Sequence, residues 1–209
     1  MQVGRRIVSE IVTPINAFPL AAAKQWCKID FNDDDAIITS LIRAAFKSVN
    51  TYLGYSALSA NVKIEFNGLS GLPAATNPIT GGVIIQGSYL QLATYIESVD
   101  ALHYVNSNNQ LTAMASGDWS NPTAISLPKM CVKIPVKNVP SDLTEDSVKY
   151  VVSVKEGYTA LPEDILMAVR LLVSQWYDNR SAIVTGVSTT TLDNTVQFLL
   201  DPYRSMQVL

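Results

Sequence analysis

Apolar residues recur at helical spacing in the N-terminal quarter of the chain. Between residues 33 and 53 they follow one another at intervals of one and three, which places them on one face of an amphipathic helix. These residues are Ile37, Ile38, Leu41, Ile42, Ala45, Phe46, Val49, Tyr52 and Leu53. Gly54 is a typical residue to end that helix. A first helix is expected within residues 14–29, where Pro19 suits the first helical position.

A second helical pattern follows Gly157. Proline and two acids at Pro162, Glu163 and Asp164 are typical of a helix N-terminus. From Ile165 to Tyr177 the single charge is Arg170, and apolar residues lie on more than one side. A helix of this kind is deeply buried or packs against another chain. Residues 181–190 are expected to form a loop, and a short last helix is expected at roughly 192–200, closed by Pro202.

The stretch between the two helical regions alternates short β-rich runs with turn residues. This pattern predicts an antiparallel sheet or small sandwich. The fold class is therefore α+β: a discontinuous helical bundle of residues 1–59 plus 157–209, with an inserted antiparallel β domain of residues 60–156. Three independent pieces also fit the pattern. The candidate strands are Val62–Phe66, Gly82–Gln86, Leu90–Ile96, Ala101–Val105, Leu111–Ala115, Ala124–Leu127, Cys131–Val136 and Val148–Val154.

Composition narrows the classes of protein that fit. The 209 residues carry a formal charge of −3, and 16% are charged, which is low for a soluble domain. Part of the surface is therefore expected to be covered, and copies of the same chain are one candidate. The acidic balance argues against a dedicated nucleic-acid binder. No transmembrane or signal-peptide run is found, and Cys27 and Cys131 are expected to be reduced and buried.

The usual constellations for catalysis or metal binding are missing. His103 is the single histidine, and with two distant cysteines it makes no standard zinc site. Residues 82–88 have a phosphate-loop frame, but Ser88 stands where its lysine belongs. Residues 30–35 match part of a calcium loop but lack its glycine and its glutamate. We expect Asn32 or Asp33 to cap the following helix instead, and we predict no enzyme, metal or cofactor.

Several segments, taken in order, resemble the head–tail connector proteins of long-tailed phages, also called neck adaptors or head-completion proteins. The N-terminal segments are similar to that family's short helix, acidic cap and long helix ending in Tyr-Leu-Gly. They are Leu20–Lys24, Trp26–Asp30, Asn32–Asp35, Ile37–Ile38, Leu41–Ile42, Ala44–Ala45 and Tyr52–Gly54. The C-terminal segments are Gly157–Tyr158, Leu161–Ile165, Leu171–Val173, Trp176–Tyr177, Asn179–Arg180 and Leu199–Arg204. Together the segments span about half of the chain.

The resemblance implies a structural role without enzymatic activity. Proteins of this family form a ring, usually of twelve copies, beneath the portal at one capsid vertex. The ring extends the DNA channel and carries the stopper and tail. The implied partners are other copies of the chain, the portal, a stopper or tail-completion protein, and double-stranded DNA that passes without sequence-specific contacts. No membrane partner is implied. The implied location is the neck of the virion, after assembly in the host cytoplasm.

Two groups of residues are candidates for these contacts. On the apolar helix, Met167, Leu171, Trp176 and Arg180 are candidate ring contacts. Trp176 and Arg180 lie on one helix face, so that either a stacked pair or ordinary core packing fits them. The family's C-terminal tail is implied to dock on the portal. The candidates there are Pro202, Tyr203, Arg204, Met206 and Leu209, and a frayed terminus is the alternative.

Other functions fit the sequence less well. A stopper or tail-completion protein is typically shorter and dominated by β-structure. An enzyme using Asp100, His103 and a serine is contradicted by spacing, because residues three apart in a strand face opposite sides. A DNA-packaging subunit requires a basic face, whereas the 15 Lys and Arg are scattered. The inserted β domain is the expected contact for tail or capsid proteins.

Overall fold

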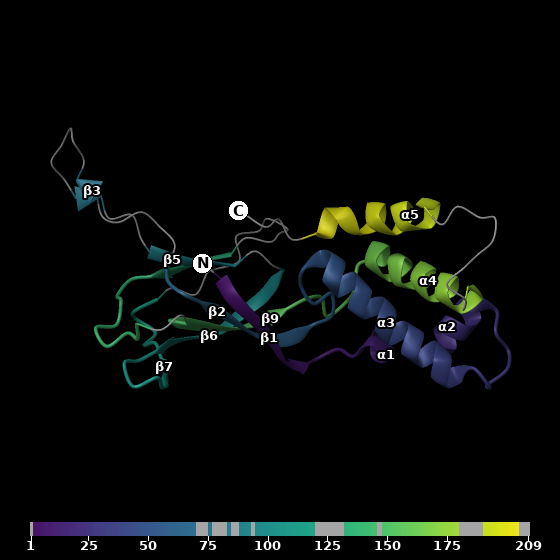
Figure 1. The fold of residues 1–209 in the computed structure, drawn as a ribbon, viewed down its shortest axis with the longest axis horizontal. Coiled ribbons are helices and arrows are strands. Elements are labelled where there is room, and N and C mark those ends of the chain that lie inside the picture. The colour runs from purple at the N-terminus through teal and green to yellow at the C-terminus, as the bar shows by residue number, and fades with distance from the viewer. Residues whose placement is uncertain are drawn as a thin grey trace. The chain divides into compact units, whose positions relative to one another are not determined.

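The computed structural model describes residues 2–69, 75–76, 83–84, 88–92, 95–119, 132–145, 148–179 and 190–204. These residues combine helices with a five-stranded sheet, so the predicted α+β class is confirmed (Figure 1). They fall into two compact units. The β unit contains the chain up to Ser9 together with residues 61–156, and the helical unit contains residues 10–60 and 157–205. The predicted division into a helical domain of residues 1–59 plus 157–209 and an inserted β domain of residues 60–156 stays a prediction.

The core of the helical unit is formed by helices from the two ends of the chain. α3 (Asp35–Leu53) packs against α4 (Glu163–Asp178), which also packs against α5 (Thr190–Leu200). α1 (Pro14–Ala17) and α2 (Leu20–Cys27) lie on α3, and a 3-10 turn, η1 (Asp201–Tyr203), follows α5. The shared core consists of Ile38, Ile42, Phe46 and Val49 from α3 with Ile165, Val169, Leu172 and Val173 from α4.

The ends of these helices follow from local sequence. Gly54 ends α3 with a positive φ of 81°, a conformation that costs glycine little. The stretch expected to hold a first helix forms two helices, because the chain leaves helical geometry at Phe18 and Pro19. Pro19 and Pro162 each lie one position before the first helical residue, where their missing N–H is harmless.

The β unit is built on a sheet with the strand order β1-β2-β9-β6-β7. Its strands are β1 (Gln2–Glu10), β2 (Ala60–Phe66), β9 (Tyr150–Glu156), β6 (Ile96–Val105) and β7 (Leu111–Ala113). β2 buries every second residue, so that one face of the sheet forms the core. Two antiparallel pairs join β5 (Ser88–Leu92) to β8 (Val132–Val136) and β3 (Ala75–Thr76) to β4 (Val83–Ile84).

Most predicted strands in the described residues are found near their expected positions. The exceptions have physical reasons. The predicted strand 90–96 is divided between the end of β5 and the start of β6, and that at 82–86 is described only as β4. The strand at 124–127 lies outside the described residues. β1 was not predicted, because its residues 6–10 are all exposed and show no alternation of apolar and polar side chains.

Candidate functional site

The C-terminal segment is fastened to the helical unit by a cluster of aromatic and acidic side chains. Tyr52, near the end of α3, donates its hydroxyl hydrogen bond to the Asp201 carboxylate. The Arg204 guanidinium carbon lies 5.3 Å from the centre of the same Tyr52 ring, within the range of a cation–π interaction. One aromatic residue on α3 therefore holds both ends of the segment Asp201–Arg204.

Tyr203 supplies the second attachment. Its hydroxyl donates to the Asp164 Oδ2 atom at 3.0 Å, in the first turn of α4. Its ring also meets the Tyr158 ring edge to face, with centroids 6.4 Å apart and planes at 84°. We call Tyr52, Tyr158, Asp164 and Asp201–Arg204 the C-terminal clamp, because together they anchor η1 on three separate parts of the helical unit.

The two hydroxyl donors of the clamp have shifted acidities. The hydrogen bond to Asp201 raises the pKa of Tyr52. Partial burial, followed by the hydrogen bond to Asp164, raises the pKa of Tyr203. The two shifts share one contribution, because ionisation of either phenol would remove its hydrogen-bond donor and place a second negative charge beside a carboxylate.

The clamp includes three of the five residues proposed from the sequence as portal contacts. Pro202 and Arg204 are exposed and Tyr203 is half-buried, and the last two already have partners within the chain. Met206 and Leu209 lie outside the described residues. The sequence could not indicate the clamp partners Tyr52 and Tyr158, because only the tertiary fold brings them to the C-terminal segment.

The residues proposed as ring contacts lie along α4. Met167, Leu171 and Trp176 are all half-buried, which leaves part of each side chain at the surface. The fully buried residues of α4 lie at other positions, so this helix presents an apolar core face and further apolar groups beside it. Arg180 lies outside the described residues, and the proposed Trp176–Arg180 stack stays a prediction.

A different arginine of α4 makes the aromatic contacts that the structure describes. The Arg170 guanidinium carbon lies 5.6 Å from the centre of the Trp26 ring and 5.9 Å from that of Phe18. Phe18 is buried, whereas Trp26 is 40% exposed. Arg170 thus connects the N-terminal helices to α4. This contact could not be predicted from the sequence, because the partners are distant in the chain.

The acidic run at residues 30–35 is used for packing between helices. Tyr177 donates to the Asp34 Oδ2 atom at 2.6 Å. Lys24 Nζ donates to Asn32 at 2.6 Å and to Asp35 at 2.8 Å. The expected capping residue was wrong: Asp34 occupies the N-cap position of α3, and its carboxylate accepts from Tyr177 rather than from a backbone N–H of the helix. No group of three potential metal ligands occurs among the described residues.

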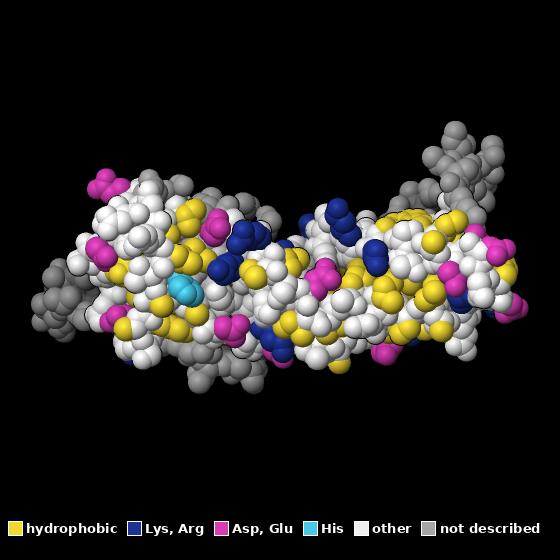
Figure 2. All heavy atoms as spheres, turned by 90° about the horizontal axis from the view of Figure 1, so that it is seen from below, with side chains coloured by type: hydrophobic (Ala, Val, Ile, Leu, Met, Phe, Trp, Pro, Cys, Tyr) yellow, Lys and Arg dark blue, Asp and Glu magenta, His cyan; other side chains and the backbone are white. Residues whose placement is uncertain are grey.

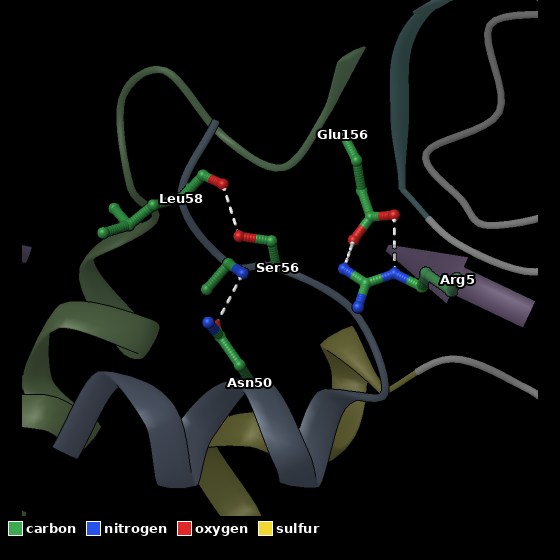
Figure 3. A network of polar contacts seen from close by, with 6 residues as sticks. Arg5, Asn50, Ser56, Leu58 and Glu156 are labelled. Atoms are coloured by element: carbon green, nitrogen blue, oxygen red, sulfur yellow. Dashed lines mark hydrogen bonds and ion pairs between the residues drawn. The ribbon is translucent and has the colours of Figure 1, made fainter. Parts of the chain in front are cut away.

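A buried ion pair attaches the N-terminal strand within the β unit. Arg5 donates to both carboxylate oxygens of Glu156, with Nε 3.1 Å from Oε2 (Figure 3). The Glu156 side chain is fully buried, and that of Arg5 is 25% exposed. Figure 3 also shows the end of α3, where Asn50 accepts from the Ala57 backbone N–H at 2.8 Å and so holds the following loop.

The surface carries charged and apolar side chains side by side (Figure 2). Phe198 on α5 is 79% exposed and Val8 on β1 is 54% exposed. His103 is the one cyan residue of Figure 2, and burial together with Lys63 lowers its pKa. Cys27 is half-buried rather than buried as expected, and burial and Asp178 raise the pKa of its thiol. Cys131 lies outside the described residues.

Among the described residues, no helix is both long enough and apolar enough to cross a bilayer.

Comparison with solved structures finds chains of similar fold. The neck of an empty gene transfer agent (GTA) particle contains a chain with the same fold, at a TM-score of 0.65 and 19% identity, over 99% of this chain and 98% of that one. Chains from the virion and the neck of the native particle, the latter computed with C12 symmetry, match at 0.63 and 20% over the same shares. No curated protein matches.

The family is also recognised in sequence. Residues 19–109 match the family described as phage gp6-like head-tail connector protein. The matched part is less than half of the chain. The resemblance found in the sequence is thereby confirmed.

Proposed function

We propose that this chain is a structural neck adaptor, which forms a ring between the capsid portal and the tail and does no catalysis. The observation that carries the proposal is the match of nearly the whole chain to neck proteins of a GTA particle, together with the connector family of residues 19–109. The symmetry of those necks supports a ring of copies. The specific partners, namely a portal, a stopper or tail-completion protein and passing DNA, are part of the proposal.

The ring is proposed to use the partly exposed apolar groups of α4. Met167, Leu171 and Trp176 combine apolar character with incomplete burial, which suits an interface completed by a neighbouring copy. A Met167→Lys, Leu171→Lys variant is expected to lose rings in electron micrographs. Gln175→Lys on the same helix is the control, because it adds one lysine at a half-buried polar position. Rings of normal size from the double variant would exclude this interface.

The C-terminal tail is proposed to dock on the portal. In the clamp, Tyr203 and Arg204 already contact the helical unit, so the proposal assigns the portal contact chiefly to the residues that follow Arg204. Truncation after Arg204 removes the tail and keeps the clamp contacts, whereas truncation before Pro202 also removes Tyr203 and Arg204. The two truncations separate docking by the tail from stability of the clamp.

The decisive experiment is capture of the tagged full-length chain from phage-producing cells, with mass spectrometry of the proteins that co-purify. We expect the portal to be recovered by the full-length chain and lost on truncation after Arg204. Recovery of tail proteins alone would favour a stopper or tail-completion role. If no virion protein co-purified with the full-length chain, the structural proposal would be wrong.

A further inference from the structure

The N-terminal strand leaves one edge of the main sheet open. Among the residues that the structure describes, β1 has a single neighbour, β2, and lies at one end of the strand order. It is nine residues long. An edge strand of this length presents a row of backbone N–H and C=O groups that can pair with a further strand.

The side chains of β1 point to the same use. Its residues 6–10 are all exposed, so this half of the strand buries little surface within its own unit. The exposed residues include two β-branched apolar ones, Ile7 at 41% and Val8 at 54%. Two side-chain contacts also hold the strand: the Arg5–Glu156 ion pair, and the hydrogen bond that Asn61 donates to the Ser9 hydroxyl at 2.9 Å.

Edge strands of free proteins normally carry features that prevent further pairing. Proline, a bulge or an exposed lysine in the middle of the strand are the common ones. β1 contains no proline and no lysine; its exposed charges are Arg6 and Glu10, and the three residues between them, Ile7 to Ser9, are uncharged. The open edge therefore fits a further β-strand, which would bind through main-chain hydrogen bonds and small apolar contacts.

The other end of the same sheet offers a matching edge. β7 is the last strand of the order, and its Leu111 is 47% exposed. The two edges point away from each other across five strands, roughly 19 Å apart at the usual spacing. A ring closed by rotation needs two different surfaces on each copy, one meeting the other on the neighbour.

We propose that β1 of one copy pairs with β7 of the neighbouring copy, so that the sheets of successive copies join around the ring. This inference rests on the proposed adaptor ring. Charge favours the pairing: Arg6 on β1 is exposed, and the β7 side carries acidic groups. Among these, Asp118 follows β7 closely, and Asp142 accepts from Tyr104, a residue paired with β7.

The test is site-directed cross-linking of the full-length chain in assembled rings. Val8→Cys and Leu111→Cys are combined in a Cys27→Ser, Cys131→Ser background, and the rings are treated with a short bismaleimide. We expect the double-cysteine chain to give a ladder of covalent oligomers on a denaturing gel. Each single-cysteine chain is the matched control. It is expected to stay monomeric on the gel, since the introduced thiol then has no second thiol opposite it.

Three outcomes overturn the proposal. Dimers from Val8→Cys alone would mean that β1 pairs with β1. Rings that form normally but give no ladder would exclude the β1–β7 contact and leave the adaptor ring intact. Failure of the background chain to form any ring would contradict the proposed function and, with it, this inference.

A variant without added cysteines gives an independent measurement. Val8→Lys places a charge within the uncharged part of the open edge, where it opposes pairing with another strand. We expect fewer rings at equal concentration and an unchanged circular dichroism spectrum and melting temperature of the subunit, because Val8 is exposed. Unchanged ring formation would overturn the proposal.

Discussion

Glu156 illustrates how much can depend on one residue pair. Its carboxylate is fully buried and accepts two hydrogen bonds from Arg5. Removing one partner of a buried pair leaves an uncompensated charge, which is far more costly than the pair itself is favourable. The pair also ties β1, which buries little surface elsewhere, to the neighbouring part of the β unit.

Replacement of Arg5 by alanine is therefore expected to destabilise the protein. Breaking a fully buried pair costs about 3–5 kcal/mol, and the partial exposure of Arg5 reduces our expectation to about 2–3 kcal/mol. Urea unfolding monitored by circular dichroism measures this change. Arg6→Ala, on the same strand but exposed, is the control and should change the free energy of unfolding by less than about 0.5 kcal/mol. Equal effects of the two variants would contradict the role of the ion pair.

The hydroxyl groups of the clamp can be tested one atom at a time. Tyr52→Phe, Tyr203→Phe keeps both rings and removes both donors to Asp201 and Asp164. We expect trypsin to cleave after Arg204 severalfold faster in this variant, because local opening becomes easier when the segment loses its hydrogen bonds. The rate is read by mass spectrometry of the released peptide. An unchanged rate would show that packing of the tyrosine aromatic rings, without their hydroxyl groups, is sufficient to hold the segment.

The clamp is also expected to open at alkaline pH. Both phenols have raised pKa values in the folded protein, so their stabilising contribution is complete below the unfolded value of about 10 and is lost as the pH rises through the higher folded values. A titration of phenolate absorbance, taken as the difference between the wild-type chain and Tyr52→Phe, Tyr203→Phe, measures these two groups. A midpoint at or below the ordinary tyrosine value would contradict the hydrogen-bonding scheme.

Between elements, the passage from β9 to α4 depends on Gly157. This residue has a φ of +89°, and a Cβ atom there would lie 2.4 Å from the Leu58 carbonyl oxygen and 2.5 Å from that of Ser56. Both neighbours are backbone atoms that cannot rotate away. Position 157 therefore requires glycine for two reasons: its positive φ, and the close approach of the backbone of residues 56–58.

Gly157→Ala is expected to cost about 2–4 kcal/mol, the sum of left-handed backbone strain and overpacking. Gly117→Ala is the matched control, because a Cβ there meets no atom within 4 Å, and it should be close to neutral. Thermal unfolding of both variants makes the comparison. A Gly157→Ala protein as stable as Gly117→Ala would mean that the loop at residues 56–58 rearranges freely.

The elements that the sequence predicted well are those whose pattern is local. α3 and its end at Gly54 were predicted because a repeating apolar face and a terminal glycine lie within one stretch of chain. β1 was missed because its exposed half has no such pattern. The cap of α3 was assigned to the wrong residue, since the choice between Asn32, Asp33 and Asp34 depends on Tyr177, a partner on α4.

The same division holds for the candidate sites. The apolar character of α4 marked Met167 and Leu171 as unusual from sequence alone. The clamp partners Tyr52 and Asp164 and the Arg170 contact with Trp26 were invisible, because they join residues that only the folded chain brings together. Sequence thus indicated which helix and which tail to examine, and tertiary structure showed what their side chains already contact.

For the molecule as a whole, the proposed function links the fold to assembly with several neighbours. The full-length match at 19% identity shows that this arrangement of helices and sheet tolerates extensive change in sequence. The proposed contacts along α4, at the edges of the sheet and beyond the clamp each concern a different neighbour. A neck component needs such separate surfaces, because it meets its own copies, the portal and the tail simultaneously.

The charge of the molecule bears on its proposed place around DNA. Each chain carries a formal charge of −3, and non-specific DNA binding depends on lysine and arginine replacing phosphate counterions. We expect assembled rings to show no saturable binding of duplex DNA at about 0.15 M salt in a fluorescence anisotropy titration. A channel that lets DNA slide requires this weak attraction.

A charge-reversed chain provides the control for that measurement. Asp30→Lys, Asp33→Lys alters two exposed positions of the acidic run and changes the sign of the formal net charge. We expect this variant to bind DNA, with an affinity that falls as salt is raised. Tight, salt-sensitive binding by the unaltered ring would contradict a sliding channel, because each phosphate contact would then hold the DNA that the neck must pass.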